Sequence, residues 1–515
     1  MIVYKHSGLT GLKNGYLYHS ISGIWNSRPV PGDLMYYFAL PVQQIGSVIG
    51  GVGFVLNNWP LFLISTGFLG VWFFIMFHTG TPVANKLLSF RINGIKKAAG
   101  IVFIVLVAVG LCEVITVISS HSLTADTSSD AFRQVLSEFS NGFSYNDSTA
   151  LTAQAVNNLL AGRNPYENSN VVTALAKYNQ SSDRLTPLRT GVFAKVFPYP
   201  TLQQLKDAWQ AAIQKPSQPA PEFAGTYCYP AGDFLLPVPF FLIGITDLRL
   251  IYLILTLLAI GYVIYLLPSR KRYLFIGAAI ISLELWTSIA NGDTGALVFP
   301  FLLLAWVLIR KNIWFSAVCM GIAVATKQTA WFFLPFYLIA VFKTTGVKKA
   351  GYVAAIMALI FLAANLPFAM RDYGSWVTSI VTPMSNNMFP VGVGLVSLVT
   401  NGIINVNSPF IFDIVEFMVL GCGIIWYLFY FKRYPQLGPV LAIFPIFFAW
   451  RSLFGYFFYT GLIVLAMVLS ENKDLYGSLE SQSINSCYNK AQLSTDTETT
   501  AYERNTGKNN RLDAL

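Results

Sequence analysis

Residues 248–267 read LRLIYLILTLLAIGYVIYLL and contain one charged side chain, Arg249, ahead of the basic run at 270–272. Twenty helical residues rise about 30 Å, the thickness of the hydrocarbon core of a membrane. Lys and Arg collect on the cytoplasmic side of such segments. This stretch therefore predicts a transmembrane helix whose C-terminal end faces the cytoplasm.

The composition of the whole chain indicates the same class of protein. Hydrophobic residues make up 54% of the 515 positions, charged residues make up 11%, and the mean hydropathy is +0.54. Soluble domains carry about a quarter charged residues, so this chain has too few to cover a water-facing surface. The net charge of +10 fits loops that orient membrane spans, so we expect membrane lipids and not nucleic acid as partners. The five cysteines are scattered without a CxxC pair, which argues against a structural zinc site.

Twelve apolar runs are long enough to cross a membrane or nearly so. They are 35–56, 59–78, 98–119, 248–267, 273–290, 295–309, 313–326, 329–342, 348–369, 409–431, 437–450 and 454–470. Two shorter stretches, 233–246 and 390–405, contain Pro and Gly, and we expect them to be re-entrant or interfacial. The predicted fold is an all-α polytopic transmembrane bundle with one large outer loop.

The basic clusters between these runs predict which side each loop faces. With the N-terminus inside and twelve spans, every basic cluster lies in the cytoplasm. If only one of the short stretches crossed, the later clusters would invert. The expected segments are a cytoplasmic N-terminus at 1–34, three spans at 35–119, an extracytoplasmic loop at 120–232, a transmembrane bundle carrying the chemistry at 233–470, and a disordered cytoplasmic tail at 471–515.

The large loop contains a predicted amphipathic helix that begins at Asp147. Apolar residues recur on one face from Leu151 to Leu160, and Gly162 stands where a C′ glycine belongs. We expect a second helix at 202–213. Asp147 stands at the N-cap position, where it serves as a helix cap, as a carboxylate held in place as a general base, or as both.

The run SYNDSTALTAQAVNNLLAGRNPYE at 144–167 resembles the first outer loop of GT-C membrane glycosyltransferases, in which an acidic residue precedes an amphipathic helix ending in Gly-x-(Asn/Asp)-Pro-Tyr. Four later stretches are similar in order and spacing to glycosyltransferase family 87. They are Tyr229-Pro230, NGDTGALVFPFLLLAWVLIRK at 291–311, GIAVATKQTAWFFLPF at 321–336, and WRSLFGYFF at 450–458. Two departures stand out: three spans precede the acidic loop where the usual pattern has one, and Ala231 replaces the second proline of Tyr-Pro-Pro.

The resemblance implies a function. Such enzymes transfer a sugar, here a mannose-like hexose, from a polyprenyl-phosphate donor to a lipid- or protein-linked acceptor on the extracytoplasmic face of the cell membrane. Asp147 matches the catalytic acidic position. Cations must hold the lipid phosphate as charge builds on it, and the candidates are Arg451 and Lys327, at predicted outer ends of spans. The alternatives are an ion pair of Arg451 with Glu113 or Glu284, and snorkelling of Lys327 to the interface.

Three further residues are candidate substrate contacts. Asp293 lies in a predicted outer turn, as a turn former or as a second acid for sugar hydroxyls or a divalent metal; no other cofactor is implied. Tyr166 offers a ring for stacking on a sugar, although tyrosine is common in interfacial belts. Arg371 precedes a predicted outer loop and is a substrate contact or an interfacial anchor.

Two other classes of protein fit the sequence. A transporter or lipid flippase would use the acids Glu113, Glu284, Asp413 and Glu416 as a path. Transporters are usually built from paired repeats, and the sequence contains no repeat. A non-catalytic membrane subunit that docks a partner through its large loop is also compatible with the sequence.

Overall fold

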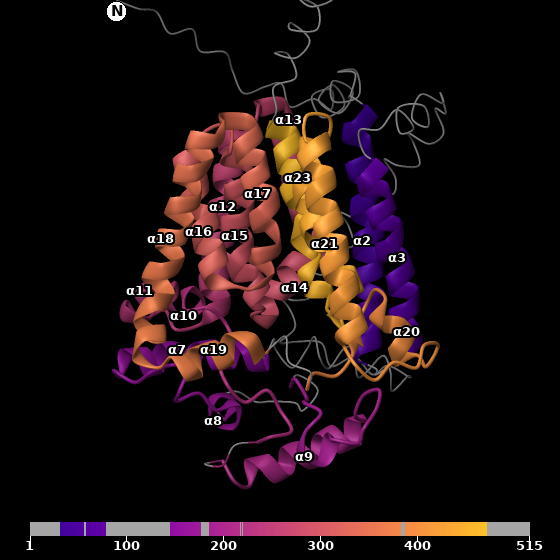
Figure 1. The fold of residues 1–515 in the computed structure, drawn as a ribbon, viewed down its shortest axis with the longest axis vertical. Coiled ribbons are helices and arrows are strands. Elements are labelled where there is room, and N and C mark those ends of the chain that lie inside the picture. The colour runs from indigo at the N-terminus through magenta and orange to yellow at the C-terminus, as the bar shows by residue number, and fades with distance from the viewer. Residues whose placement is uncertain are drawn as a thin grey trace, which may run out of the picture. The chain divides into compact units, whose positions relative to one another are not determined.

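The computed structural model describes a helical bundle (Figure 1). The described residues are 31–55, 58–78, 145–176, 185–216, 218, 220–382 and 387–470. The predicted span at 98–119, residues 1–30 of the N-terminal segment and the tail from 471 lie outside them. The chain divides into a unit Met1–Val468, which holds nearly all of the described helices, and a C-terminal unit Leu469–Leu515.

Four described helices are long and apolar enough to cross a membrane. They are α3 (Trp59–His78), α12 (Leu248–Leu266), α18 (Val347–Arg371) and α21 (Phe410–Tyr430). A fifth span results if α13 (Ser269–Ile281) and α14 (Leu283–Asn291), bent by 52° at Ser282, are counted together. Large apolar side chains such as Leu359 on α18 and Phe417 on α21 are more than half exposed, as expected of helices that face lipid. The membrane bundle is therefore confirmed; the described residues contain four or five candidate spans, and the predicted number of twelve is not confirmed.

The other bundle helices match the remaining predicted apolar runs closely. They are α2 (Pro31–Val55), α15 (Thr294–Leu308), α16 (Ile313–Thr326), α17 (Thr329–Thr345), η4 (Pro435–Leu437), α22 (Gly438–Ile443), η5 (Phe444–Phe448), η6 (Phe454–Tyr456) and α23 (Phe458–Ser470). α16 packs against both α15 and α18. A Cβ at Gly321 would lie 2.9 Å from Ile360 Cδ1, so this glycine permits the close approach of α16 to α18.

Neither of the two short stretches forms a helix long enough to cross a membrane. The first contains α10 (Gly232–Leu235) and α11 (Val238–Leu242), and the second contains β1 (Val391–Gly392) and α20 (Val396–Thr400). β1 pairs in parallel with β2 (Arg451–Ser452), with Val391 opposite Arg451. Gly392 has φ +116°, and a Cβ there would lie 1.9 Å from the Ser452 carbonyl oxygen, so the pairing requires glycine. This short pairing fixes the backbone of Arg451.

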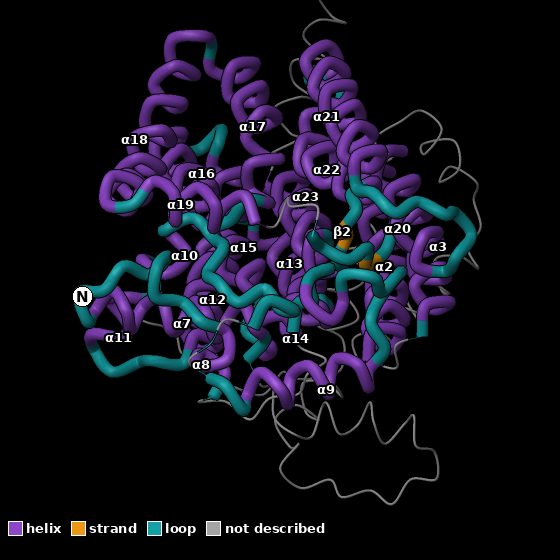
Figure 2. Tube along the Cα trace, turned by 60° about the horizontal axis from the view of Figure 1, so that its bottom comes forward, coloured by secondary structure: helices purple, strands orange, loops and turns teal. Residues whose placement is uncertain are grey.

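Several helices lie across one end of the bundle (Figures 1 and 2). They are α7 (Asp147–Leu160), α8 (Val171–Leu175), α9 (Leu202–Ile213) and α19 (Tyr373–Val381); the short helix η2 (Gly191–Phe193) precedes α9 in the chain. The predicted helix at 202–213 is confirmed, as is the left-handed Gly162 after α7, at φ +74°. The predicted N-cap of α7 is wrong by one residue. Asn146 is the cap, because its extended backbone lets its side-chain oxygen accept from Thr149 N–H at 2.9 Å, and Asp147 is the first helical residue.

Candidate functional site

A polar face fastens α7 to the bundle. Asn146, Thr149 and Thr152 recur every three residues, so they lie on one side of the helix. Their bonds run from Asn146 Nδ2 to Asp293 Oδ1 at 2.7 Å, from Thr149 Oγ1 to the Gly292 carbonyl, and from Thr152 Oγ1 to Asp233 Oδ2 at 2.6 Å. The partners lie on α10 and on the turn between α14 and α15. The three bonds therefore fix where α7 lies along its axis and which face it turns to the bundle.

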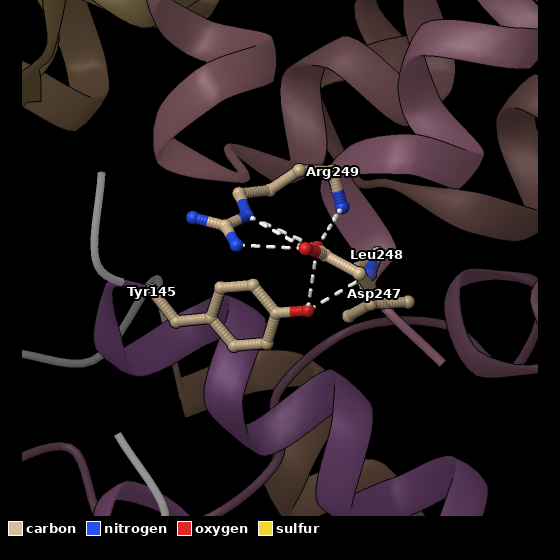
Figure 3. Close-up of polar contacts among 4 residues, drawn as sticks. All are labelled: Tyr145, Asp247, Leu248 and Arg249. Atoms are coloured by element: carbon tan, nitrogen blue, oxygen red, sulfur yellow. Dashed lines mark hydrogen bonds and ion pairs between the residues drawn. The ribbon is translucent and has the colours of Figure 1, made fainter. Parts of the chain in front are cut away.

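A second attachment lies just before the cap of α7 (Figure 3). The Tyr145 hydroxyl donates to Asp247 Oδ1 at 3.0 Å and accepts from Leu248 N–H at 2.8 Å. Arg249 Nη2 forms an ion pair with Asp247 Oδ2 at 2.7 Å, and its guanidinium lies 5.4 Å from the centre of the Tyr145 ring. The chain therefore enters α7 from a point fixed to the start of α12.

Asp147 is held at the start of α7 with its carboxylate nearly enclosed, at 9% exposure. Oδ1 accepts the Ser148 N–H at 2.7 Å, and Oδ2 accepts the Thr186 N–H at 2.7 Å. Burial raises the pKa of Asp147 above its ordinary 3.8, while the bonds from Thr186 and the charge of Arg451 oppose the rise. A buried carboxylate with a raised pKa and unused lone pairs suits general-base chemistry.

Arg451, about 300 residues further along the chain, contacts the same residue as Asp147, namely Thr186. Its Nη2 donates to Thr186 Oγ1 at 3.2 Å, and its Nη1 lies 3.5 Å from the sulfur of Met388. The ion pair with Glu284 considered from the sequence is not formed between these described residues, since Glu284 lies beside Gln44, to which its N–H donates at 3.4 Å. Glu113, the other candidate partner, lies outside the described residues.

Lys327 follows α16 as its C-cap residue and is 8% exposed. Its Nζ donates to Thr294 Oγ1 at 2.7 Å and lies 5.6 Å and 5.9 Å from the ring centres of Tyr229 and Tyr456. The ammonium is enclosed by protein, which argues against snorkelling to the interface. An enclosed cation in a polar and aromatic setting is available for an anionic ligand.

Asp293 is the N-cap residue of α15 and follows Gly292, whose φ is +73°. A Cβ at Gly292 would lie 2.8 Å from Thr149 Cγ2, so α7 packs tightly on this turn. The negative charges of Asp293 and Asp233 both act on the Lys327 ammonium. Asp293 is thus both a turn residue and a member of the charged cluster.

Sequence reasoning missed two residues of this cluster. Asp233 is fully buried, and its Oδ2 accepts from Thr152 and from the Tyr227 hydroxyl at 3.0 Å. The sequence feature that could have identified Asp233 is its position directly before an apolar run, four residues after Tyr229. Thr186 lies in the loop between helices and carried no sequence signal.

Tyr166 and Arg371 have other surroundings. Tyr166 is 3% exposed, and its hydroxyl donates to the Tyr229 carbonyl at 3.0 Å, so it supports the backbone beside Lys327. Arg371 is exposed at the last residue of α18 and lies outside the contacts that join Asp147 and Arg451. Among the described residues, no group of three His, Cys, Asp or Glu side chains is placed to hold a metal ion.

The acid Asp147 and the cations Arg451 and Lys327 thus lie at one end of a helical bundle whose described part contains four or five candidate membrane spans. The model of glycosyltransferase family 87 matches residues 227–442, which confirms the resemblance seen in the sequence and indicates a glycosyltransferase. Lys327 and Asp293 lie inside the matched segment, whereas Asp147 and Arg451 lie outside it. No curated protein and no solved structure matches the chain.

Proposed function

We propose that the protein transfers a mannose-like hexose from a polyprenyl-phosphate donor to a lipid- or protein-linked acceptor at the outer face of the membrane. The observation that carries this proposal is that Asp147 and Arg451 both bond to Thr186. They do so in a chain whose residues 227–442 match glycosyltransferase family 87. A base and a cation are the two groups that transfer from a sugar phosphate requires.

The proposed reaction is a single displacement. The acceptor hydroxyl gives its proton to Asp147, and its oxygen bonds to the anomeric carbon as the bond from that carbon to the phosphate oxygen breaks. The lipid phosphate leaves with the electron pair, and Arg451 and Lys327 stabilise its charge. Attack opposite the leaving group inverts the anomeric centre. The enclosure of Asp147 and Lys327 strengthens these electrostatic contacts by limiting water.

The distribution of basic residues supports an extracytoplasmic site. Lys311 Nζ donates to the Leu266 carbonyl at 2.9 Å. Arg272 Nε donates to the Leu267 carbonyl at 3.0 Å, so both cations lie at the C-terminal end of α12. Asp247, beside the entry to α7, lies at the other end of this helix, about 28 Å away along its axis. Because basic loops face the cytoplasm, the α7 end would face outward.

The decisive experiment replaces Asp147 by Asn in the full-length protein in proteoliposomes. Transfer of labelled sugar from a polyprenyl-phosphate donor should fall by roughly 10²–10⁴-fold, the usual contribution of a general base. Asp207→Asn is the matched control, because Asp207 is exposed on α9 and should leave transfer unchanged. Full activity of Asp147→Asn would remove Asp147 as the base.

Two further measurements test the rest of the proposal. Movement of lipid across the bilayer without a glycosidic product would identify a transporter instead. For sidedness, a membrane-impermeant thiol reagent added outside intact cells should modify Gln210→Cys on α9 and spare Lys348→Cys on α18. The reverse labelling pattern would place the site in the cytoplasm.

A further inference from the structure

Thr186 forms hydrogen bonds with both Asp147 and Arg451. Its main-chain N–H donates to Asp147 Oδ2 at 2.7 Å, and its side-chain oxygen accepts from Arg451 Nη2 at 3.2 Å. The acid and the cation thus share one neighbour, although they belong to α7 and β2. Thr186 itself belongs to neither element.

The backbone around Thr186 is held from two sides. The Thr186 carbonyl accepts from Ala224 N–H at 2.9 Å, and Leu188 N–H donates to the Glu222 carbonyl at 2.8 Å. On the other side Arg189 N–H donates to the carbonyl of residue 387 at 2.7 Å. The residue after Thr186 is a proline, which restricts Thr186 to extended backbone. Thr186 therefore has a fixed backbone, and the side chains of Asp147 and Arg451 both bond to it.

We infer that Thr186 is a positioning residue that orients the Asp147 carboxylate and couples it to the Arg451 guanidinium. The inference rests on the proposed function of Asp147 as the base. The Thr186 N–H occupies one lone pair of Oδ2, and the Ser148 N–H occupies one of Oδ1, which leaves the carboxylate turned in a single direction with lone pairs for an acceptor hydroxyl. The Thr186 hydroxyl keeps the guanidinium beside that carboxylate.

Because of these contacts, the pKa of Asp147 should depend on the side chain at position 186. The ionisable groups near the carboxylate are Arg451 on β2, Tyr199 before α9, and Cys228 before α10. Burial raises the pKa of Asp147, and the Thr186 and Arg451 contacts oppose the rise. Loss of the Thr186 hydroxyl removes its own bond to the carboxylate and the anchor of Arg451, the one cation among these neighbours, so the pKa of Asp147 should rise further.

The test compares Thr186→Val, which removes the hydroxyl at nearly constant shape, with Thr186→Ser, which keeps it. The acid limb of the pH profile of kcat/KM should move up by about one pH unit in Thr186→Val, the lower end of the effect of an opposite charge. Thr186→Ser should retain the wild-type limb. Thr190→Val is the matched control, because Thr190 lies in the same segment and its hydroxyl donates to the Pro221 carbonyl instead. The acid limb of the pH profile of this variant should coincide with that of the wild type.

Two outcomes overturn the inference. In the first, Thr186→Val keeps the wild-type acid limb. In the second, Thr186→Val shifts the limb equally in the wild-type and Arg451→Gln backgrounds, which would show that Thr186 does not act through Arg451. If Thr186→Val does not fold, Thr186→Ala provides the same comparison without the branched side chain. If the wild-type protein transfers no sugar, the proposed function is wrong. If the wild type is active but the acid limb of kcat/KM is unchanged in Thr186→Val, only the present inference is wrong.

Discussion

The side-chain amide of Asn146 donates a 2.7 Å hydrogen bond to the carboxylate of Asp293. The same residue caps α7 through its side-chain oxygen, which accepts from Thr149 N–H. One side chain therefore begins the helix that carries Asp147 and ties that helix to the turn before α15. Asp293, proposed from the sequence as a sugar or metal contact, has at least one oxygen committed to holding α7.

Asn146→Asp separates these two roles. Aspartate caps a helix as well as asparagine does, so the cap should survive. The new carboxylate would face that of Asp293, and their repulsion should grow as rising pH ionises both groups. We expect a lower melting temperature in detergent than wild type, with a difference that widens from acidic to neutral pH. Asn146→Ala, which loses the cap at about 1 kcal/mol, should show a difference that changes little with pH. Equal pH dependence of the two variants would contradict the contact.

Lys327→Met should impair use of the donor. Removing the enclosed ammonium takes away a phosphate contact and leaves the negative charges of Asp293 and Asp233 uncompensated. We expect kcat/KM for the donor to fall by at least about 10-fold, since a hydrogen bond to a charged group is worth about 1.5–3 kcal/mol. Lys343→Met, in the last turn of α17 and exposed, should behave as wild type. An undiminished rate in Lys327→Met would exclude this lysine from the site.

Asp233→Ala should destabilise the attachment of α7. The change leaves the buried hydroxyls of Thr152 and Tyr227 without their shared acceptor. A hydrogen bond to a charged group is worth about 1.5–3 kcal/mol, so thermal unfolding in detergent should begin at a clearly lower temperature. Asp207→Ala removes an exposed carboxylate on α9 and should stay within about 0.5 kcal/mol of wild type. Indistinguishable unfolding of the two variants would show that the Asp233 bonds contribute nothing.

The pH profile of the wild-type enzyme should reflect the enclosure of Asp147. A general base works only when ionised, and burial raises its pKa above 3.8. Activity should therefore be lost, as pH falls, at a higher pH than an exposed aspartate would give. A profile of kcat/KM that stays level down to the ordinary range of aspartate would contradict this prediction.

The helices were predictable because long apolar runs and basic flanks are local signals. The bounds expected at 59–78, 313–326 and 202–213 are those of α3, α16 and α9. The cap of α7 was missed by one residue, since Asn146 and Asp147 both suit a cap and only the backbone at Asn146 decides between them.

The site was less predictable than the helices. Asp147, Arg451 and Lys327 were nominated by their sequence motifs and by charge at the ends of apolar runs. Thr186 could not be nominated, because its role arises from contacts between segments that are distant in sequence, and an uncharged loop threonine resembles any other. Arg371 was nominated only by its place before a predicted outer loop, and it lies exposed at the end of α18.

The three-residue spacing of the polar face of α7 also determines which changes of length the chain can accept. One residue inserted between Thr149 and Thr152 would rotate the following part of the helix by about 100°. Thr152 would then turn away from Asp233 while Asn146 stayed beside Asp293, and the helix could not satisfy both ends. Homologous chains should therefore vary in length after Gly162 and keep a constant register from the cap of α7 to Thr152.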